Sequence, residues 1–298
     1  NENTYPVPAG VREAVDAALA ATPLNRYPDP MSNDLRDELA AWHGVARENV
    51  CVGNGGDELL YNYLLAFGGA GRTLLNCPPC FSEYAFFASL CQTEVRDVWR
   101  DPATFELDQA AVLAAAPECG LAIVTSPNNP TGNAFPDREI EELLRRFDGV
   151  VVLDEAYIDF AEGRGFLPRL DEFPNLIVLQ TLSKAWGMAG LRLGLAFASE
   201  RIAALFGQVK YPYNINTLTQ QTAAECLHRN IAAQVAQIRE ERGRLAAALA
   251  GCGCIERVYP SQANFLLVKT ADPDRLYGEL IAAGAVSYTH LRAHETCA

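Results

Sequence analysis

The sequence predicts an α/β fold in which a mostly parallel β-sheet is sandwiched by helices. Strand-like and helix-like segments alternate along much of the chain. The strand-like segments are nearly continuous apolar runs, such as Leu121-Ala-Ile-Val-Thr125, which is typical of strands buried on both faces. Polar clusters follow the runs that end at Val52, Val124, Leu153 and Leu179. Because parallel sheets bind ligands at the carboxyl ends of their strands, we expect these clusters to form one site.

The composition excludes several classes of protein. The chain has 298 residues and a formal net charge of −13, which argues against nucleic acid or an anionic membrane as a partner. No apolar run approaches the length of a membrane span and no signal peptide opens the chain, so we expect a cytoplasmic protein. Nine unevenly spaced cysteines favour reduced thiols. Cys77 and Cys80 have the spacing of a zinc-ligand pair, as do Cys252 and Cys254. Neither pair has further ligands nearby, so we expect no metal site.

The first half of the chain supplies most of the expected sheet. The segment after Ser32 illustrates a helix, because Leu35, Leu39 and Trp42 recur along one face and the pattern ends near Gly44. Further helices are expected at residues 7–21, 59–67, 82–91, 107–116 and 137–147, and strands at 50–52, 73–76, 93–98 and 121–125.

The second half is expected to complete the sheet and to build a smaller domain. Residues 196–199 read as an edge strand of reversed direction. A single long helix is expected from about residue 219 to residue 249, a length suited to linking two domains, and Gly251 and Gly253 end it. The remaining strands are expected at residues 150–153, 176–179, 255–259 and 265–268, the last two of them paired, and a final helix at 272–283.

A lysine after the strand at residues 176–179 is the central candidate for chemistry. Ser183 and Lys184 follow this strand in a turn of small residues, and Arg192 lies eight positions beyond the lysine. This grouping suits a cofactor that carries an aldehyde and a phosphate, because the amine forms a Schiff base while the hydroxyl and guanidinium hold phosphate oxygens. A solvated lysine is the alternative for an isolated Ser-Lys pair, and the other polar clusters argue against it.

Those other clusters match the needs of a pyridoxal-type cofactor. Asp154, at the end of an apolar strand, could stabilise a proton on a pyridine nitrogen, although a helix cap or surface carboxylate is the alternative. Asn129 and Tyr157 could donate to the ring's phenolic oxygen, although Asn129 could equally serve the turn between two prolines. Residues 53–56 form a glycine turn before a helix, which is either an anion site or a simple tight turn. Once released, the amine of Lys184 could act as a general base.

Six motifs occur in an order that resembles a known family. They are Asn1-Glu-Asn3, Arg26-Tyr-Pro-Asp-Pro30, Gly53-Asn-Gly-Gly-Asp-Glu58, Ser126-Pro-Asn-Asn-Pro-Thr-Gly132, Asp154-Glu-Ala-Tyr157, and Thr181-Leu-Ser-Lys-Ala185 continuing through Gly190-Leu-Arg192. The chain resembles the fold-type-I pyridoxal-phosphate aminotransferases, and within them the histidinol-phosphate aminotransferase family, from residue 1 to about residue 285.

The resemblance implies a role for each candidate residue. Lys184 would be the Schiff-base lysine, Asp154 would face the pyridine nitrogen, and Tyr157 with Asn129 would contact the ring hydroxyl. Phe81 would stack on the ring in place of a tyrosine that is common there. Tyr27 would reach the cofactor phosphate of a neighbouring subunit, which implies a homodimer with shared sites. The phosphate in the subunit's own site would be held by Ser183, Arg192 and the backbone of Gly56 and Asp57.

The resemblance also implies the architecture and the reaction. The sheet would have seven strands, and the domains would comprise residues 1–25 (part of the small domain), 26–218 (the large domain) and 219–285 (the linking helix and truncated small domain). The reaction would convert histidinol phosphate and 2-oxoglutarate to imidazole acetol phosphate and glutamate, in histidine biosynthesis. Aromatic-amino-acid aminotransferases and threonine-phosphate decarboxylases resemble the chain nearly as well. A non-catalytic binding module is disfavoured by the combination of Lys184 and Asp154.

From residue 286 onward the chain departs from the family. The family continues after Gly284 with strands and helices that carry two arginines for the substrate's carboxylate, whereas residues 286–298 read VSYTHLRAHETCA. This tail resembles a translated sequencing adapter, so we expect it to be foreign. His290 and His294 have a metal-binding spacing, but with this origin we expect no zinc, and nothing supports Arg292 as a carboxylate anchor. We therefore expect the chain to take up pyridoxal phosphate and to transaminate poorly.

Overall fold

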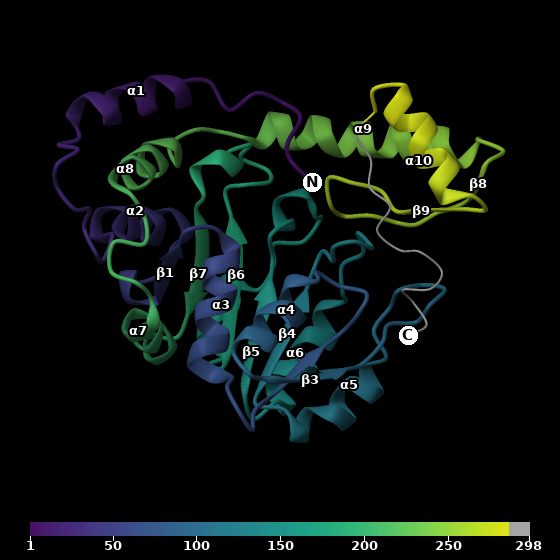
Figure 1. The fold of residues 1–298 in the computed structure, drawn as a ribbon, viewed down its shortest axis with the longest axis horizontal. Helices are drawn as coiled ribbons and strands as arrows, with labels where there is room; N and C mark the ends of the chain where they lie inside the picture. The colour runs from purple at the N-terminus through teal and green to yellow at the C-terminus, as the bar shows by residue number, and fades with distance from the viewer. Residues whose placement is uncertain (286–298) are drawn as a thin grey trace.

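The computed structural model describes residues 1–285, and they form an α/β fold around one large sheet (Figure 1). The sheet has seven strands in the order β1-β7-β6-β5-β4-β2-β3. Strand β7 is antiparallel to its neighbours β1 and β6, while the other paired strands are parallel. The mostly parallel α/β fold is thus confirmed. The strands are β1 (Val50–Gly53), β2 (Thr73–Asn76), β3 (Glu94–Asp97), β4 (Leu121–Thr125), β5 (Val150–Asp154), β6 (Leu176–Thr181) and β7 (Gly194–Ala198).

The sheet separates two apolar cores because its central strands are buried on both faces. In β4, Ala122 and Val124 belong to one hydrophobic cluster, and Leu121 and Ile123 belong to the other. Strand β3 differs, because it lies at the edge of the sheet and each of its residues is exposed. Three of its four residues are charged, which disfavours pairing with a strand of another molecule.

Helices cover both faces, as expected for this class of sheet. The core on one face receives buried side chains from α3, α4 and α7, and the core on the other receives them from α1, α2, α5, α6, α8 and α9. The helices are α1 (Val11–Ala21), α2 (Asn33–His43), α3 (Gly56–Phe67), α4 (Glu83–Leu90), α5 (Gln109–Ala115), α6 (Asp137–Arg146), α7 (Glu200–Val209), α8 (Thr217–Cys226), α9 (Ala232–Ala250) and α10 (Pro273–Ala282).

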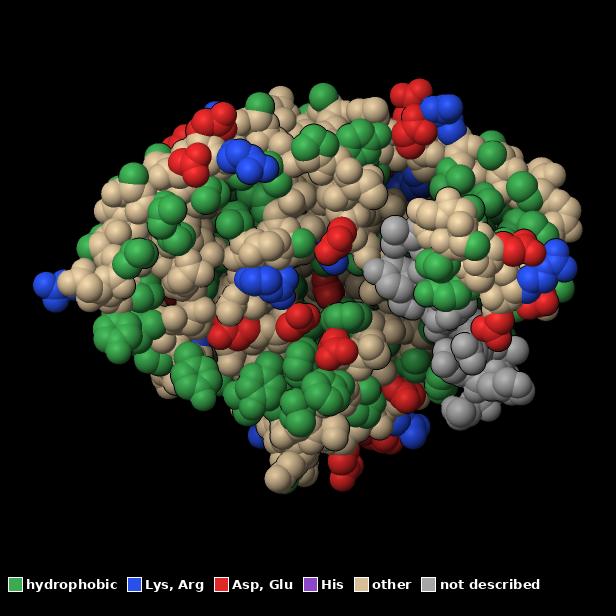
Figure 2. Space-filling view, turned by 45° about the horizontal axis from the view of Figure 1, so that its top comes forward, with side chains coloured by type: hydrophobic (Ala, Val, Ile, Leu, Met, Phe, Trp, Pro, Cys, Tyr) green, Lys and Arg blue, Asp and Glu red, His purple; other side chains and the backbone are tan. Residues whose placement is uncertain are grey.

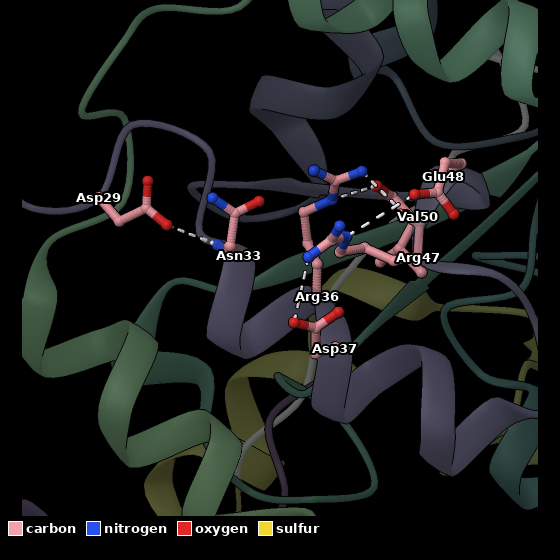
Figure 3. A network of polar contacts seen from close by, with 7 residues as sticks. All are labelled: Asp29, Asn33, Arg36, Asp37, Arg47, Glu48 and Val50. Atoms are coloured by element: carbon pink, nitrogen blue, oxygen red, sulfur yellow. Dashed lines mark hydrogen bonds and ion pairs between the residues drawn. The ribbon is translucent and has the colours of Figure 1, made fainter.

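A polar network joins the start of α2 to the start of β1 (Figure 3). The guanidinium of Arg36 donates to the carbonyl oxygens of Val50 (2.9 Å) and Arg47 (2.8 Å), so the helix holds the backbone that leads into the sheet. The carboxylate of Asp29 accepts a hydrogen bond from the backbone N–H of Asn33 at 2.7 Å. Asp29 therefore caps the first turn of α2.

Two expectations about the second half of the chain were wrong. Strand β7 has the reversed direction that was expected, but it lies between β1 and β6 rather than at an edge. All of its residues are buried, as an interior position requires. The single helix expected from residue 219 to residue 249 is two helices, α8 and α9. The side chain of Asn230 accepts from the N–H of Ala232 at 2.8 Å, which starts a new helix after the chain turns.

Trp42, expected on the apolar face of α2, is 47% exposed.

A smaller unit follows α9. Strands β8 (Ile255–Val258) and β9 (Val268–Thr270) form an antiparallel pair, as predicted, although β9 begins later than expected. Figure 1 shows the N-terminal segment between this unit and the large sheet, and Asn264 donates to the carbonyl oxygen of Asn1 at 3.4 Å. The domain boundaries at residues 25, 218 and 285 stay predictions. The expectations for the tail at residues 286–298, namely its foreign origin and the absence of a zinc site and of a carboxylate anchor, concern residues outside the described part of the chain. Within residues 1–285, no helix could cross a bilayer and no three His, Cys, Asp or Glu side chains form a metal-binding group.

Candidate active site

A cavity of about 400 Å³ opens where β4, β5 and β6 end and where α3 begins. Figure 2 shows a hollow in the middle of one face of the molecule, with acidic and basic side chains inside it. Every predicted site residue except Tyr27 lines this cavity: Gly56, Asp57, Phe81, Asn129, Asp154, Tyr157, Ser183, Lys184 and Arg192. The segments that carry polar clusters therefore do converge at one edge of the sheet. A neighbouring cavity of about 360 Å³ beside Trp42 and Trp186 contains none of these residues.

Lys184 lies in a tight turn just after β6. The turn is closed by hydrogen bonds from the N–H of Gly187 to the carbonyl of Lys184 (3.2 Å) and from Met188 to Leu182 (3.1 Å). The amine lies 5.8 Å from the centre of the Tyr157 ring. Burial lowers the pKa of Lys184, against the opposing charge of nearby carboxylates. A larger share of the amine is therefore neutral at a given pH, as a nucleophile or base requires.

Asp154 is the last residue of β5 and is only 6% exposed. One carboxylate oxygen accepts from the hydroxyl of Tyr84 at 2.7 Å, and the other accepts from the N–H of Ala156 at 3.0 Å. Burial raises the pKa of Asp154, although these hydrogen bonds and the charge of Lys184 oppose the rise. A cation bound beside this carboxylate would favour its charged form.

Ser183, Arg192 and the first turn of α3 form a cradle for an anion. Gly56 begins α3 and lines the cavity. The free backbone N–H groups of the first turn of α3, and the positive end of its helix dipole, therefore face the cavity. The guanidinium of Arg192 lies 3.6 Å from the carboxylate of Asp57. A Cβ added at Gly55 would lie 2.4 Å from this guanidinium, so only glycine allows the approach. The hydroxyl of Ser183 lies 2.9 Å from that of Thr181.

Asn129 and Tyr157 converge through the N-terminal segment. The side-chain amide of Asn1 donates to the hydroxyl of Tyr157 at 3.0 Å and to the amide oxygen of Asn129 at 3.4 Å. Phe81 lies at the cavity wall, with its ring centre 5.6 Å from that of Tyr84 in an edge-to-face arrangement. These polar and aromatic groups suit a small ring that carries a hydroxyl.

Tyr27 does not line the cavity of its own chain. Its side chain is 81% exposed and stacks on the ring of Tyr213, with centroids 4.6 Å apart. The role that the resemblance implies for Tyr27, at the site of a neighbouring subunit, stays a prediction.

The cavity wall also contains residues that were not assigned a role from the sequence, among them Tyr84, Thr125 and Asn1. Tyr84 and Thr125 surround Asp154, and Asn1 contacts the ring-oxygen candidates. Asn1 belongs to the first of the six motifs, Asn1-Glu-Asn3. Tyr84 follows Phe81 by three residues, the spacing of neighbours on one helical face, which is the signal that could have identified it.

The residues present fit pyridoxal phosphate. A half-buried amine, a buried carboxylate whose charged form needs a cation, and an anion cradle share one cavity. These three groups match the cofactor's aldehyde, its ring nitrogen and its phosphate, respectively. When bound, the cofactor acts as an electron sink for a carbanion at the α-carbon of an amino compound.

Comparison with known proteins gives the same answer. The family described as "Aminotransferase class I and II" matches residues 1–296. The histidinol-phosphate aminotransferase of Parabacteroides distasonis is 45% identical over 268 residues, which is 89% of this chain and 77% of that protein. The structure of the Sinorhizobium meliloti histidinol-phosphate aminotransferase in complex with pyridoxal-5'-phosphate has a TM-score of 0.85 at 25% identity, over 95% of this chain and 77% of that one.

A second solved structure also shares the fold. The structure of the Clostridium acetobutylicum histidinol-phosphate aminotransferase has a TM-score of 0.88 at 23% identity, covering 96% of this chain and 86% of that chain. The chain therefore belongs to the class I and II aminotransferases, and it is a transaminase that uses pyridoxal phosphate with an amino substrate and a 2-oxo substrate.

Proposed function

We propose that this chain transfers the amino group of histidinol phosphate to 2-oxoglutarate, giving imidazole acetol phosphate and glutamate in histidine biosynthesis. The choice of amino donor is supported by the 45% identity to the Parabacteroides distasonis histidinol-phosphate aminotransferase. The observation that carries the chemistry is the sharing of one cavity by the amine of Lys184 and the buried carboxylate of Asp154.

In this proposal, Lys184 has two tasks. Its amine would hold the cofactor at the aldehyde carbon, and the same amine, when free, would move the proton of the donor's α-carbon. The lowered pKa of Lys184 supports both tasks, because only the neutral amine can attack or accept a proton. The carboxylate of Asp154 holds a proton on the cofactor's ring nitrogen, which strengthens the ring's withdrawal of electrons.

The remaining cavity residues orient the cofactor. The N–H groups of Gly56 and Asp57, the hydroxyl of Ser183 and the guanidinium of Arg192 hold its phosphate, in the manner of an anion at a helix N-terminus. Asn129 and Tyr157 contact the ring's oxygen, and Phe81 stacks on the ring face. The support for these assignments is the position of each residue on the cavity wall.

We also propose a homodimer in which Tyr27 contributes to the partner's site. Leu65, Phe86 and Leu90, on α3 and α4, are exposed apolar residues, and hydrophobic side chains gather along one side of the hollow in Figure 2. Tyr27 and Tyr213 add an exposed aromatic pair. Exposed apolar surface of this kind is typical of protein interfaces, and a second copy would cover it beside the cavity.

We infer a cytoplasmic location from the state of the cysteines. The eight cysteines within the described residues are free thiols. Burial raises the pKa of Cys51 and of Cys77 to about 11, so both thiols stay protonated and unreactive near neutral pH. Free thiols in this number fit a reducing compartment.

A half-reaction assay tests the proposed function without requiring full turnover. The purified protein, loaded with pyridoxal phosphate, is mixed with excess histidinol phosphate, and the keto product and the absorbance of the bound cofactor are followed together. Imidazole acetol phosphate should form in an amount that matches the loaded sites. Phenylalanine in place of histidinol phosphate is the comparison donor, and a faster reaction with it would instead support an aromatic-amino-acid aminotransferase. Release of carbon dioxide from phosphothreonine would contradict a transaminase and support a decarboxylase.

A further inference from the structure

The carboxylate of Asp154 is held by a chain of two hydroxyl groups. Tyr84 is fully buried on α4, and its hydroxyl lies 2.7 Å from a carboxylate oxygen of Asp154 and 2.7 Å from the hydroxyl of Thr125. Thr125 ends β4 and pairs in register with Asp154 on β5. The three side chains thus meet where two adjacent strands end, and all three line the cavity.

The direction of these hydrogen bonds follows from the protons available. An ionised carboxylate can only accept, so the single hydroxyl proton of Tyr84 is donated to Asp154. The hydroxyl of Thr125 must then donate to the oxygen of Tyr84. Burial raises the pKa of Tyr84 well above its ordinary value, so the phenol keeps this proton across the working pH range. Each hydrogen bond in such a chain strengthens the next.

We propose that Tyr84, supported by Thr125, is a positioning residue that keeps the buried Asp154 ionised and aimed at the cofactor's ring nitrogen. This inference rests on the proposed role of Asp154. A carboxylate that is 6% exposed would otherwise tend to bind a proton itself, and a neutral Asp154 could not stabilise a proton on the ring nitrogen. Donation from Tyr84 to the charged form opposes this tendency.

Other charged groups also shift the pKa of Asp154. Lys184, after β6, favours the ionised form of Asp154, and Asp57 on α3 disfavours it. The charge of Glu155 and that of Asp154 also repel each other. The thiol of Cys80 raises the pKa of Tyr84 and is not among the groups that shift the pKa of Asp154. Tyr84 and Ala156 are the hydrogen-bond donors that lower the pKa of Asp154. Of these two donors, only Tyr84 uses a side chain, so it can be removed by substitution.

The first test uses the cofactor-free protein, so it does not depend on the proposed function. Aspartate labelled with ¹³C at the side-chain carboxyl is titrated by NMR, with Asp154→Asn used to assign the signal. Tyr84→Phe, which removes only the hydroxyl, should raise the pKa of Asp154 by about one to two pH units. Thr125→Val should raise it less, and Thr125→Ser, which keeps a hydroxyl, should restore the original value.

The second test uses the loaded protein and reads the bound cofactor's absorbance against pH. A proton on the ring nitrogen repels a proton at the nitrogen of Lys184 and so lowers the pH midpoint of the absorbance change. Tyr84→Phe should raise this midpoint, and Thr125→Val should raise it less. Tyr63→Phe is the matched control, because Tyr63 is also buried but its hydroxyl has no hydrogen-bond partner within the described residues. This control should change neither the NMR titration nor the absorbance midpoint.

The outcomes separate this inference from the proposed function. If Tyr84→Phe and Thr125→Val titrate like the original protein while cofactor still binds, the inference is wrong and the function stands. If Thr125→Ser behaves like Thr125→Val, the hydroxyl chain is not the cause of the effect. If no variant binds pyridoxal phosphate and the original protein does not either, the proposed function fails, whereas the titration of Asp154 still decides the role of Tyr84.

Discussion

Replacing Gly55 with alanine tests the phosphate cradle directly. Gly55 precedes α3 with φ 86° and ψ 169°, a conformation that is essentially restricted to glycine. An alanine Cβ would lie 2.4 Å from the guanidinium nitrogen of Arg192, too close for any real contact. Gly55→Ala should therefore both strain the backbone and push the guanidinium of Arg192 away from the cavity.

The two effects have different magnitudes and different readouts. Backbone strain in this region should cost about 1–3 kcal/mol of the free energy of unfolding. Loss of a hydrogen bond between a guanidinium and a phosphate should cost about 1.5–3 kcal/mol of binding free energy. At 1.4 kcal/mol per tenfold change, the affinity for pyridoxal phosphate should fall roughly 10- to 100-fold.

The assay compares two ligands and two variants. Dissociation constants are measured for pyridoxal phosphate and for pyridoxal, which lacks the phosphate, and stability is measured by urea unfolding of the cofactor-free protein. Gly44→Ala is the control, because Gly44 also has a positive φ of 71° but no atom near its Cβ position. It should lose about 1–2 kcal/mol of stability and none of the cofactor affinity.

The cradle assignment predicts that Gly55→Ala weakens pyridoxal phosphate much more than pyridoxal. Equal weakening of both ligands would show that the substitution acts through general distortion of the cavity. Unchanged affinity for pyridoxal phosphate, with the loss of stability seen for Gly44→Ala, would show that the phosphate does not bind beside Arg192.

Three further predictions concern other parts of the site. Asp154→Asn should lower the rate of amino transfer by on the order of 10²–10³-fold while the protein stays folded, as measured by the half-reaction and by circular dichroism; an unchanged rate would remove Asp154 from the mechanism. Tyr27→Phe should leave the mass of the dimer unchanged by light scattering but weaken cofactor binding about tenfold or more, and unaltered binding would argue against a shared site. Burial raises the pKa of Glu155 from 4.5 to about 7, so the folded protein holds this proton more tightly than the unfolded chain does, and the free energy of unfolding should decline as pH rises from 4.5 to about 7. Glu155→Gln should remove that part of the pH dependence of thermal melting, and an identical pH profile in the variant would contradict the assignment.

Much of the fold could be predicted because the apolar runs in the sequence coincide with the strands that are buried in the structure. Strands such as β4 and β5 are continuous apolar runs, and such runs are typical of strands covered on both faces. The candidate site followed from the same rule, since polar residues directly after these strands must meet at one edge of the sheet. Lys184 and Asp154 were found in this way from their places after and at the end of strands.

The features that were missed depend on contacts between distant parts of the chain. Tyr84 and Asp154 are 70 positions apart, and nothing in the helix around Tyr84 reveals which strand end its hydroxyl reaches. The interior place of β7 depends on pairing with β1, which precedes it by more than a hundred residues. The break between α8 and α9 was missed because the intervening residues contain neither glycine nor proline, and Asn230, whose side chain accepts from the N–H of Ala232, is the one local signal among them.

The covalent link between Lys184 and the cofactor is the most direct measure of this account. The protein is saturated with pyridoxal phosphate, reduced with borohydride, digested and examined by mass spectrometry, with a cofactor-free sample as the blank. We predict that the pyridoxyl group is found on Lys184 at a stoichiometry near one per chain. Attachment to another lysine, or no attachment in a folded and saturated sample, would rule out Lys184 as the residue that binds the cofactor.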